Sequence, residues 1–119
     1  SPKVVNATRG KKKTQNIRIM ANYASNLLFA STENEKDLEK MAELLRENFF
    51  DCNVDWYDEY IDVDFSSKWC YPEGVIDEII SSLEEISKIY IRILSFELAS
   101  EYVSFRIFSN GEWKLMIET

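Results

Sequence analysis

The residues best placed to do chemistry in this sequence are carboxylates, because the chain contains no histidine. Asp55, Asp62 and Asp64 occur in two neighbouring runs in which acidic residues alternate with apolar ones. Such a trio could bind Mg²⁺ or Ca²⁺ through oxygen atoms, or it could fill the polar positions of a half-exposed β-hairpin. We favour the second interpretation, because the alternation by itself requires a polar residue at each of these positions.

The other residue types exclude most familiar active sites. Without histidine, neither a Cys-His nucleophile nor a histidine-containing zinc site can form, and Cys52 and Cys70 are too few for a four-thiolate site. The three glycines are isolated from one another, so there is no glycine-rich phosphate loop. We therefore predict that the chain is not an enzyme, has no catalytic residues, and uses no metal or cofactor.

A row of glutamates follows an expected helix. Glu35, Glu39, Glu43 and Glu47 recur every fourth residue, which places successive carboxylates about 6 Å apart along a helix. An ordinary solvated face explains this spacing, but so does a surface that imitates the phosphates of a nucleic acid. The predicted partner-binding residues combine this row with the three aspartates: Glu35, Glu39, Glu43, Glu47, Asp55, Asp62 and Asp64.

Charge divides the chain into two parts. The formal net charge is −7, yet residues 1–19 carry six bases and no acid, which leaves eight bases and all 21 acids to residues 20–119. We interpret residues 1–16 as a basic flexible arm and residues 17–119 as one domain. The arm could bind nucleic acid or fold back onto the acidic part. Its candidate nucleic-acid-binding residues are Arg9, Lys11, Lys12, Lys13 and Arg18.

The elements that position these residues follow from periodicity. Residues 26–30 form a short apolar strand, and Thr32 with Glu35 has the spacing of a capping box that begins a helix over residues 33–50. Residues 52–57 and 60–65 alternate as a hairpin with one buried face. A second helix is predicted over residues 72–85, with Pro72 at its first position.

Two further strands and a tight turn complete the pattern. Residues 88–96 are apolar on both sides, as in an interior strand, and Asn110-Gly111 joins two alternating runs as a primed turn does. The order βαββαβ followed by ββ predicts an α+β domain with a ferredoxin-like antiparallel sheet, two helices on one face and an added C-terminal β-hairpin. The opposite face would then display the three aspartates.

Three short segments resemble a known family. Residues 22–28 read Asn-Tyr-Ala-Ser-Asn-Leu-Leu, residues 65–72 place Trp69 three residues before Pro72, and residues 95–97 read Ser-Phe-Glu. These segments resemble the Api-type ferredoxin-like domains of small phage and conjugative-plasmid proteins, over about residues 21–117. The resemblance implies a ferredoxin-like fold and a mobile-element origin, with no activity to transfer. That family tends to place a glycine after the third segment, where this chain has Ser104-Phe105-Arg106.

Aromatic residues leave two further alternatives. Trp69 could cap the core beneath the second helix or form an exposed ledge for a partner. Tyr57, Tyr60, Tyr90 and Tyr102 are of the type that stacks on RNA bases in sheet-based binders, although the neighbouring aspartates oppose phosphates there.

The leading function is a cytoplasmic, non-catalytic acidic module that binds a basic protein. Its sharpest form is a mobile-element inhibitor that imitates nucleic acid toward a host nuclease or defence complex. The alternative is a nucleic-acid-binding accessory protein that acts through the arm. We expect no membrane partner, because no stretch of the sequence approaches the roughly 18 apolar residues of a membrane span.

Overall fold

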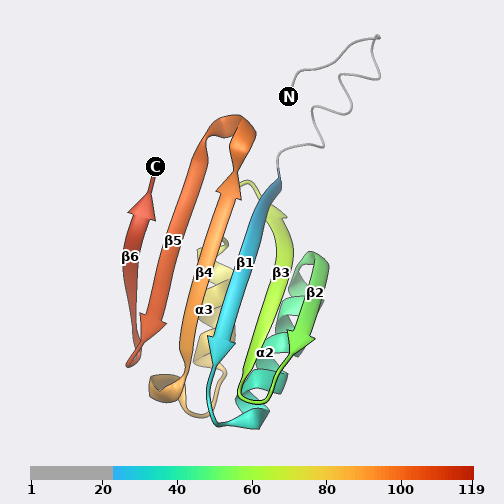
Figure 1. Ribbon diagram of the computed structural model, residues 1–119, viewed down its shortest axis with the longest axis vertical. Coiled ribbons are helices and arrows are strands. Elements are labelled where there is room, and N and C mark those ends of the chain that lie inside the picture. Colours follow the sequence, from blue (N-terminus) through green and yellow to red (C-terminus); the bar gives the residue numbers. More distant parts are fainter. Residues whose placement is uncertain (1–22) are drawn as a thin grey trace.

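A computed structural model describes residues 23–119 of the chain. It contains one six-stranded antiparallel sheet and two α-helices, in the order β1 (Tyr23–Ser31), α2 (Glu35–Asn48), β2 (Phe50–Trp56), β3 (Tyr60–Lys68), α3 (Glu73–Ser81), β4 (Tyr90–Glu97), β5 (Tyr102–Ser109) and β6 (Glu112–Glu118). The strands lie in the order β2-β3-β1-β4-β5-β6. Both helices cover the same face of this sheet, and the other face carries no helix (Figure 1).

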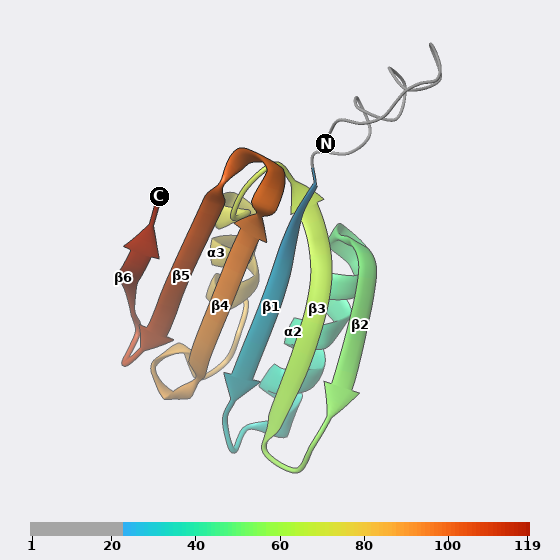
Figure 2. The ribbon, with the colours of Figure 1, turned by 45° about the horizontal axis from the view of Figure 1, so that its top comes forward.

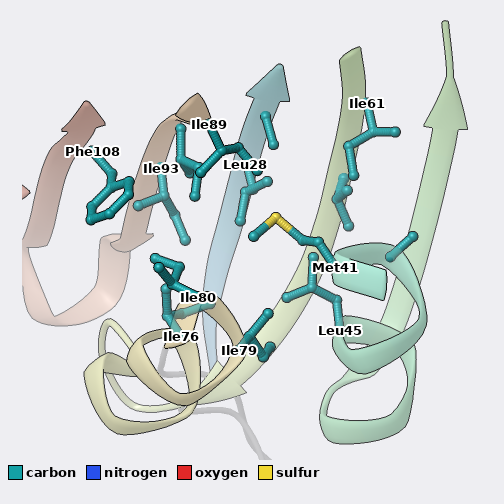
Figure 3. Packing of buried hydrophobic residues seen from close by; sticks show 14 of the residues in the cluster. Leu28, Met41, Leu45, Ile61, Ile76, Ile79, Ile80, Ile89, Ile93 and Phe108 are labelled. Carbon is teal, nitrogen blue, oxygen red and sulfur yellow. The ribbon is translucent and has the colours of Figure 1, made fainter. Parts of the chain in front are cut away.

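Alternation along the strands explains this layering. In β1, buried Leu28 and Ala30 alternate with the more exposed Leu27 and Phe29, so one face of the strand meets the helices and the other meets solvent. The buried side of the sheet meets Met41 and Leu45 from α2 and a cluster of isoleucines from α3, all of which point toward the strands in Figure 3. The expected strands and their faces are therefore confirmed in kind, with ends that differ by a few residues.

The first helix is shorter than predicted at both ends. Asn34, rather than Thr32, is its N-cap, and its side chain accepts a hydrogen bond from the backbone N–H of Asp37 at 3.0 Å. Thr32 instead accepts from the N–H of Asn34 at 3.2 Å. The helix ends at Asn48, because Phe49 already has extended backbone angles and begins the turn into β2.

The second helix ends four residues before the predicted boundary at Glu85. The N–H groups of Ser82 and Leu83 still bond to carbonyls three residues earlier, in a final tight turn. The next two amides, of Glu84 and Glu85, donate to the buried carboxylate of Asp37 at 2.9 and 3.0 Å. The carboxylate of Asp37, on α2, thus accepts hydrogen bonds from the two amides that would otherwise have continued α3.

The C-terminal hairpin has the turn that its sequence predicts. Asn110 and Gly111 both have positive φ, 53° and 79°, as a type I′ turn requires at its two central residues. The hairpin β5–β6 extends the sheet beyond β4, on the side away from β2 (Figure 2). A shift of register between Phe105 and Arg106 marks a bulge in this ladder.

One aromatic expectation is decided by the structure. Trp69 does not cap the core: 65% of its surface is exposed, and its φ of 76° turns the chain sharply after β3. Tyr71, two residues later, occupies the buried position beneath α3 instead, with 5% of its surface exposed. Within residues 23–119, neither helix combines the length and apolar character needed to cross a membrane.

Candidate interaction surface

The seven predicted partner-binding carboxylates lie on two opposite sides of the domain. Glu35, Glu39, Glu43 and Glu47 are exposed along α2, whose buried residues face the sheet. Asp55, Asp62 and Asp64 are exposed on the sheet face that carries no helix, because they alternate with core residues of β2 and β3. The acids therefore form two separate surfaces, and one flat partner cannot contact both.

The glutamates of α2 are mixed with bases. Lys36, Lys40 and Arg46 are exposed on the same helix and offset three of its four exposed glutamates. Asp37, the fifth acid, is buried and bonded to the backbone of the turn after α3. The exposed side of α2 is consequently almost neutral over its length, which weakens its likeness to a row of phosphates.

The aspartates of the sheet, by contrast, lie close together. Asp55 of β2 is the cross-strand partner of Asp62 in β3, and Asp64 follows two residues later on the same side. Like charges directly opposite one another destabilise a sheet. No group of three or more acidic or cysteine side chains in residues 23–119 has an arrangement that could hold a metal ion.

Beside these aspartates the sheet is apolar. In register, Leu27 of β1 lies between Asp64 of β3 and Leu94 of β4, and Leu94 in turn pairs with Phe105 of β5. These side chains line a shallow hollow of about 540 Å³, with the three aspartates along one wall. We call this surface the open face; it comprises Leu27, Phe29, Asp55, Asp62, Asp64, Arg92, Leu94 and Phe105.

One cation lies in the middle of the open face. The guanidinium carbon of Arg92 is 4.2 Å from the centre of the Phe29 ring and 5.5 Å from that of Tyr90. Within residues 23–119, the one ion pair closer than 4.0 Å is between Arg106 and Glu118, so Arg92 is held by aromatic rings rather than by the aspartates that share its hollow.

The four tyrosines considered as stacking residues are divided between two faces. Tyr60 and Tyr90 lie on either side of Phe29 at the edge of the open face, with ring centres 5.1 and 6.3 Å from it, and Tyr57 stacks on Tyr60 at 4.5 Å. Tyr102 faces the helices, where its hydroxyl accepts a hydrogen bond from the N–H of Tyr71. Three of the four therefore belong to one aromatic group, and the fourth is structural.

The two cysteines are free in the structure. Cys70 is exposed, while Cys52 is half-buried at the edge of the core. Burial raises the pKa of the Cys52 thiol, Asp64 adds to this effect, and Arg46 opposes it. The Cys52 thiol is therefore a poor nucleophile near neutral pH.

The basic candidates Arg9, Lys11, Lys12, Lys13 and Arg18 lie outside the described residues.

The sheet also contains a buried hydrogen-bond network that the sequence did not predict. Buried Asn26 donates to the hydroxyl of Ser67 at 3.0 Å and accepts from that of Ser95 at 2.5 Å, which links β1 to both of its neighbours. The sequence feature that could have indicated this network is Asn26, an asparagine at an inward-facing position of a strand in which apolar and exposed residues alternate.

The residues of this network come from segments that are far apart in the sequence. Asn26, Ser67 and Ser95 come from the three segments that carry the resemblance, and Ser67 also donates to the carbonyl of Cys70 at 2.7 Å. Glu97 accepts hydrogen bonds from Ser100 and from the N–H of Ala99 in the turn after β4, and the bond from the Ser100 hydroxyl is the largest influence that lowers the pKa of Glu97.

Comparisons with protein-family models, with curated proteins and with solved structures found no match for this chain.

Proposed function

We propose that the chain is a non-catalytic interaction module that binds a basic protein through its open face. The observation that carries this proposal is the open face itself, where a sheet surface without a covering helix combines apolar side chains with three neighbouring carboxylates. An apolar surface contributes binding energy when water leaves it, and carboxylates at its border select a positively charged partner.

The cost of the acidic cluster supports a binding role. Asp55 and Asp62 repel each other across the β2–β3 ladder, and no lysine or arginine of β2 or β3 lies on that part of the sheet. Asparagine or threonine would fill these positions without the repulsion. A cationic partner would relieve it, so the aspartates are better suited to the complex than to the free domain.

The sharper form of the proposal is a mobile-element inhibitor that imitates nucleic acid toward a nuclease or defence complex. The exposure and regular spacing of the four glutamates of α2 support it, whereas the three exposed bases of that helix count against it. The resemblance to Api-type domains supports the origin. The order β2-β3-β1-β4 with both helices on one face also supports a ferredoxin-like unit, which β5 and β6 extend.

The test compares three charge reversals on three surfaces. Immobilised protein carries Asp55→Lys, Asp62→Lys and Asp64→Lys on the open face, or Glu39→Lys, Glu43→Lys and Glu47→Lys on α2. A matched control changes three exposed glutamates elsewhere: Glu78→Lys, Glu101→Lys and Glu112→Lys. Capture from a bacterial lysate is followed at low and high salt, and the captured protein is then purified and its affinity measured by calorimetry.

We expect the open-face reversal to abolish binding of a basic protein that the wild type and the control bind at low salt. Loss only in the α2 reversal would assign the site to the helix and favour the nucleic-acid imitation. Equal binding by all three variants would contradict the proposal. Circular dichroism of each variant separates a lost contact from a lost fold.

A second candidate function is nucleic-acid binding, and one observation favours it. Tyr60, Phe29, Tyr90 and Arg92 form a continuous aromatic and cationic group on the open face, of the kind on which bases stack. The bases of the arm would then neutralise the backbone. Fluorescence anisotropy with a labelled single-stranded oligonucleotide tests this, and Phe29→Ala and deletion of residues 1–16 should each weaken binding.

A further inference from the structure

The open face presents several adjacent apolar side chains to solvent. The exposed fraction of the residue surface is 50% for Leu27 and 54% for Ile117 on β6. Leu94 and Phe105 line the hollow between β3 and β4. Leucine and phenylalanine side chains at adjacent cross-strand positions form a continuous surface, unlike the single exposed apolar residues found on most proteins.

The charge of the domain restricts what can cover this surface. Residues 20–119 have eight bases against 21 acids, a net charge of −13, and the open face adds Asp55, Asp62 and Asp64 beside the hollow. A second copy of the domain would bring one acidic surface against another. A segment with apolar and basic side chains matches both properties of the face, because a lysine can lay its alkyl stem on leucine and direct its ammonium group to an aspartate.

The chain itself contains such a segment. Residues 9–19 read Arg-Gly-Lys-Lys-Lys-Thr-Gln-Asn-Ile-Arg-Ile, with five bases, two isoleucines and no acid. Four residues beyond it the chain enters β1, which lies at the centre of the sheet between β3 and β4. The segment is therefore joined to the surface that it complements.

The length of the connection is sufficient. Asp62 lies opposite Phe29, six residues along β1 from Tyr23, which is about 20 Å in an extended strand. Lys13 precedes Tyr23 by ten residues, a reach of about 33 Å. Because a short tether gives an effective concentration in the millimolar range, even a weak attraction would keep the segment on the face much of the time.

We propose that residues 9–19 dock across the open face, with Lys11, Lys12 and Lys13 beside the three aspartates and Ile17 or Ile19 over the apolar hollow. The docked segment occupies the surface assigned above to a basic partner, so the partner must displace it. The docking itself does not depend on the proposed function; the competition with a partner does.

The docking is tested on the full chain in the absence of any partner. Isoleucine and leucine methyl signals are recorded by NMR for the wild type, for Lys11→Gln, Lys12→Gln and Lys13→Gln combined, and for a matched control with Lys36→Gln, Lys40→Gln and Arg46→Gln on α2. The reporters are Leu27 and Leu94 on the open face and Ile117, the cross-strand neighbour of Phe105 at its border, with buried Ile91 and Ile93 as internal references.

We expect the arm variant to shift the open-face methyls while the references and the α2 control remain unchanged. Raising the salt concentration should move the wild-type signals toward those of the arm variant. Identical open-face signals in wild type and arm variant at low salt would overturn the docking.

A zero-length crosslink gives a second, independent readout. A water-soluble carbodiimide joins a lysine ammonium to a carboxylate as an amide and is itself converted to a urea. Mass spectrometry should find Lys11, Lys12 or Lys13 joined to Asp55, Asp62 or Asp64 several-fold more often than to the glutamates of α2, at a yield independent of protein concentration. Preferential coupling to α2, or a yield that rises with concentration as between two copies, would overturn the proposal.

The competition is measured afterwards, once a partner has been captured. If the segment covers the face nine-tenths of the time, the arm variant should bind the partner about tenfold more tightly than the wild type. Equal affinity together with a positive methyl result would leave the docking in place and contradict the assignment of the partner to the open face.

Discussion

Asp55 and Asp62 face each other across the β2–β3 ladder, on the side of the sheet that no helix covers. Asp62 lies between buried Ile61 and Val63, and Asp55 follows half-buried Val54, so both carboxylates stay on the side of the sheet away from the core. The two negative charges therefore repel each other within the surface proposed for binding, and the first prediction follows from this repulsion.

Replacing Asp62 with asparagine should stabilise the domain. Removal of one charge from a directly opposed pair is worth about 0.5 kcal/mol, which corresponds to a rise in melting temperature of about 2–4 °C at low salt. Differential scanning calorimetry measures the change. Asp58→Asn, in the β2–β3 turn, is the control and should give a smaller effect. The gain should shrink in high salt, and Asp55→Asn combined with Asp62→Asn should stabilise by less than the sum of the two.

Asn26→Ala should destabilise the domain by about 1–3 kcal/mol, because Ser67 and Ser95 would lose their shared partner inside the sheet. Urea denaturation at neutral pH measures the free energy of unfolding. Ser25→Ala, at the adjacent exposed position of β1, should change it by less than about 0.5 kcal/mol. Equal effects of the two substitutions would show that the buried network contributes nothing.

Asp37→Ala should lower the free energy of unfolding by a similar amount and should also loosen the segment that follows α3. Its carboxylate accepts the amides of Glu84 and Glu85, so its removal leaves two donors without a partner at the end of α3. We expect a loss of about 1–3 kcal/mol, and faster hydrogen exchange at residues 84 and 85 than in the wild type. Glu39→Ala on the exposed side of α2 is the control, since it should leave both measurements nearly unchanged.

Tyr71→Phe should make the domain more tolerant of alkali. Burial, reinforced by the charge of Asp77, raises the pKa of Tyr71 well above its ordinary value near 10, while Arg106 opposes the shift. The folded state then holds the hydroxyl proton more tightly than the unfolded state, so the free energy of unfolding falls as the pH rises above about 10. Because phenylalanine has no hydroxyl to ionise, the Tyr71→Phe variant lacks this contribution to the decrease in the free energy of unfolding.

The same substitution has an expected effect at neutral pH. Among residues 23–119, the buried hydroxyl of Tyr71 has no hydrogen-bond partner, so its removal should stabilise the domain by about 1 kcal/mol. Tyr102→Phe is the matched control, because the hydroxyl of Tyr102 does accept a bond, from the N–H of Tyr71 at 2.9 Å, and its loss should destabilise. Urea denaturation at pH 7 and pH 10.5 measures both variants, and a Tyr71→Phe variant less stable than the wild type at both values would contradict the prediction.

The sequence by itself determined which segments form strands and helices and which side of each is buried. Period-two alternation in β1, β3 and β4 and helical spacing in α2 and α3 reflect which side chains must leave water, and that requirement acts residue by residue. It also determined the turn at Asn110-Gly111, where two successive positive φ angles suit these residue types. The exposure of Asp55, Asp62 and Asp64 on the open face followed from the same alternation.

The tertiary structure alone decided what depends on contacts between distant residues. The end of α3 is set by Asp37, which precedes its hydrogen-bond donor Glu84 by 47 positions, and local helical periodicity contains no sign of that contact. Trp69 is exposed because the chain turns before Tyr71 reaches the core. The apolar hollow beside the aspartates exists only once the strands pair, because pairing brings Asp64, Leu27 and Leu94 side by side.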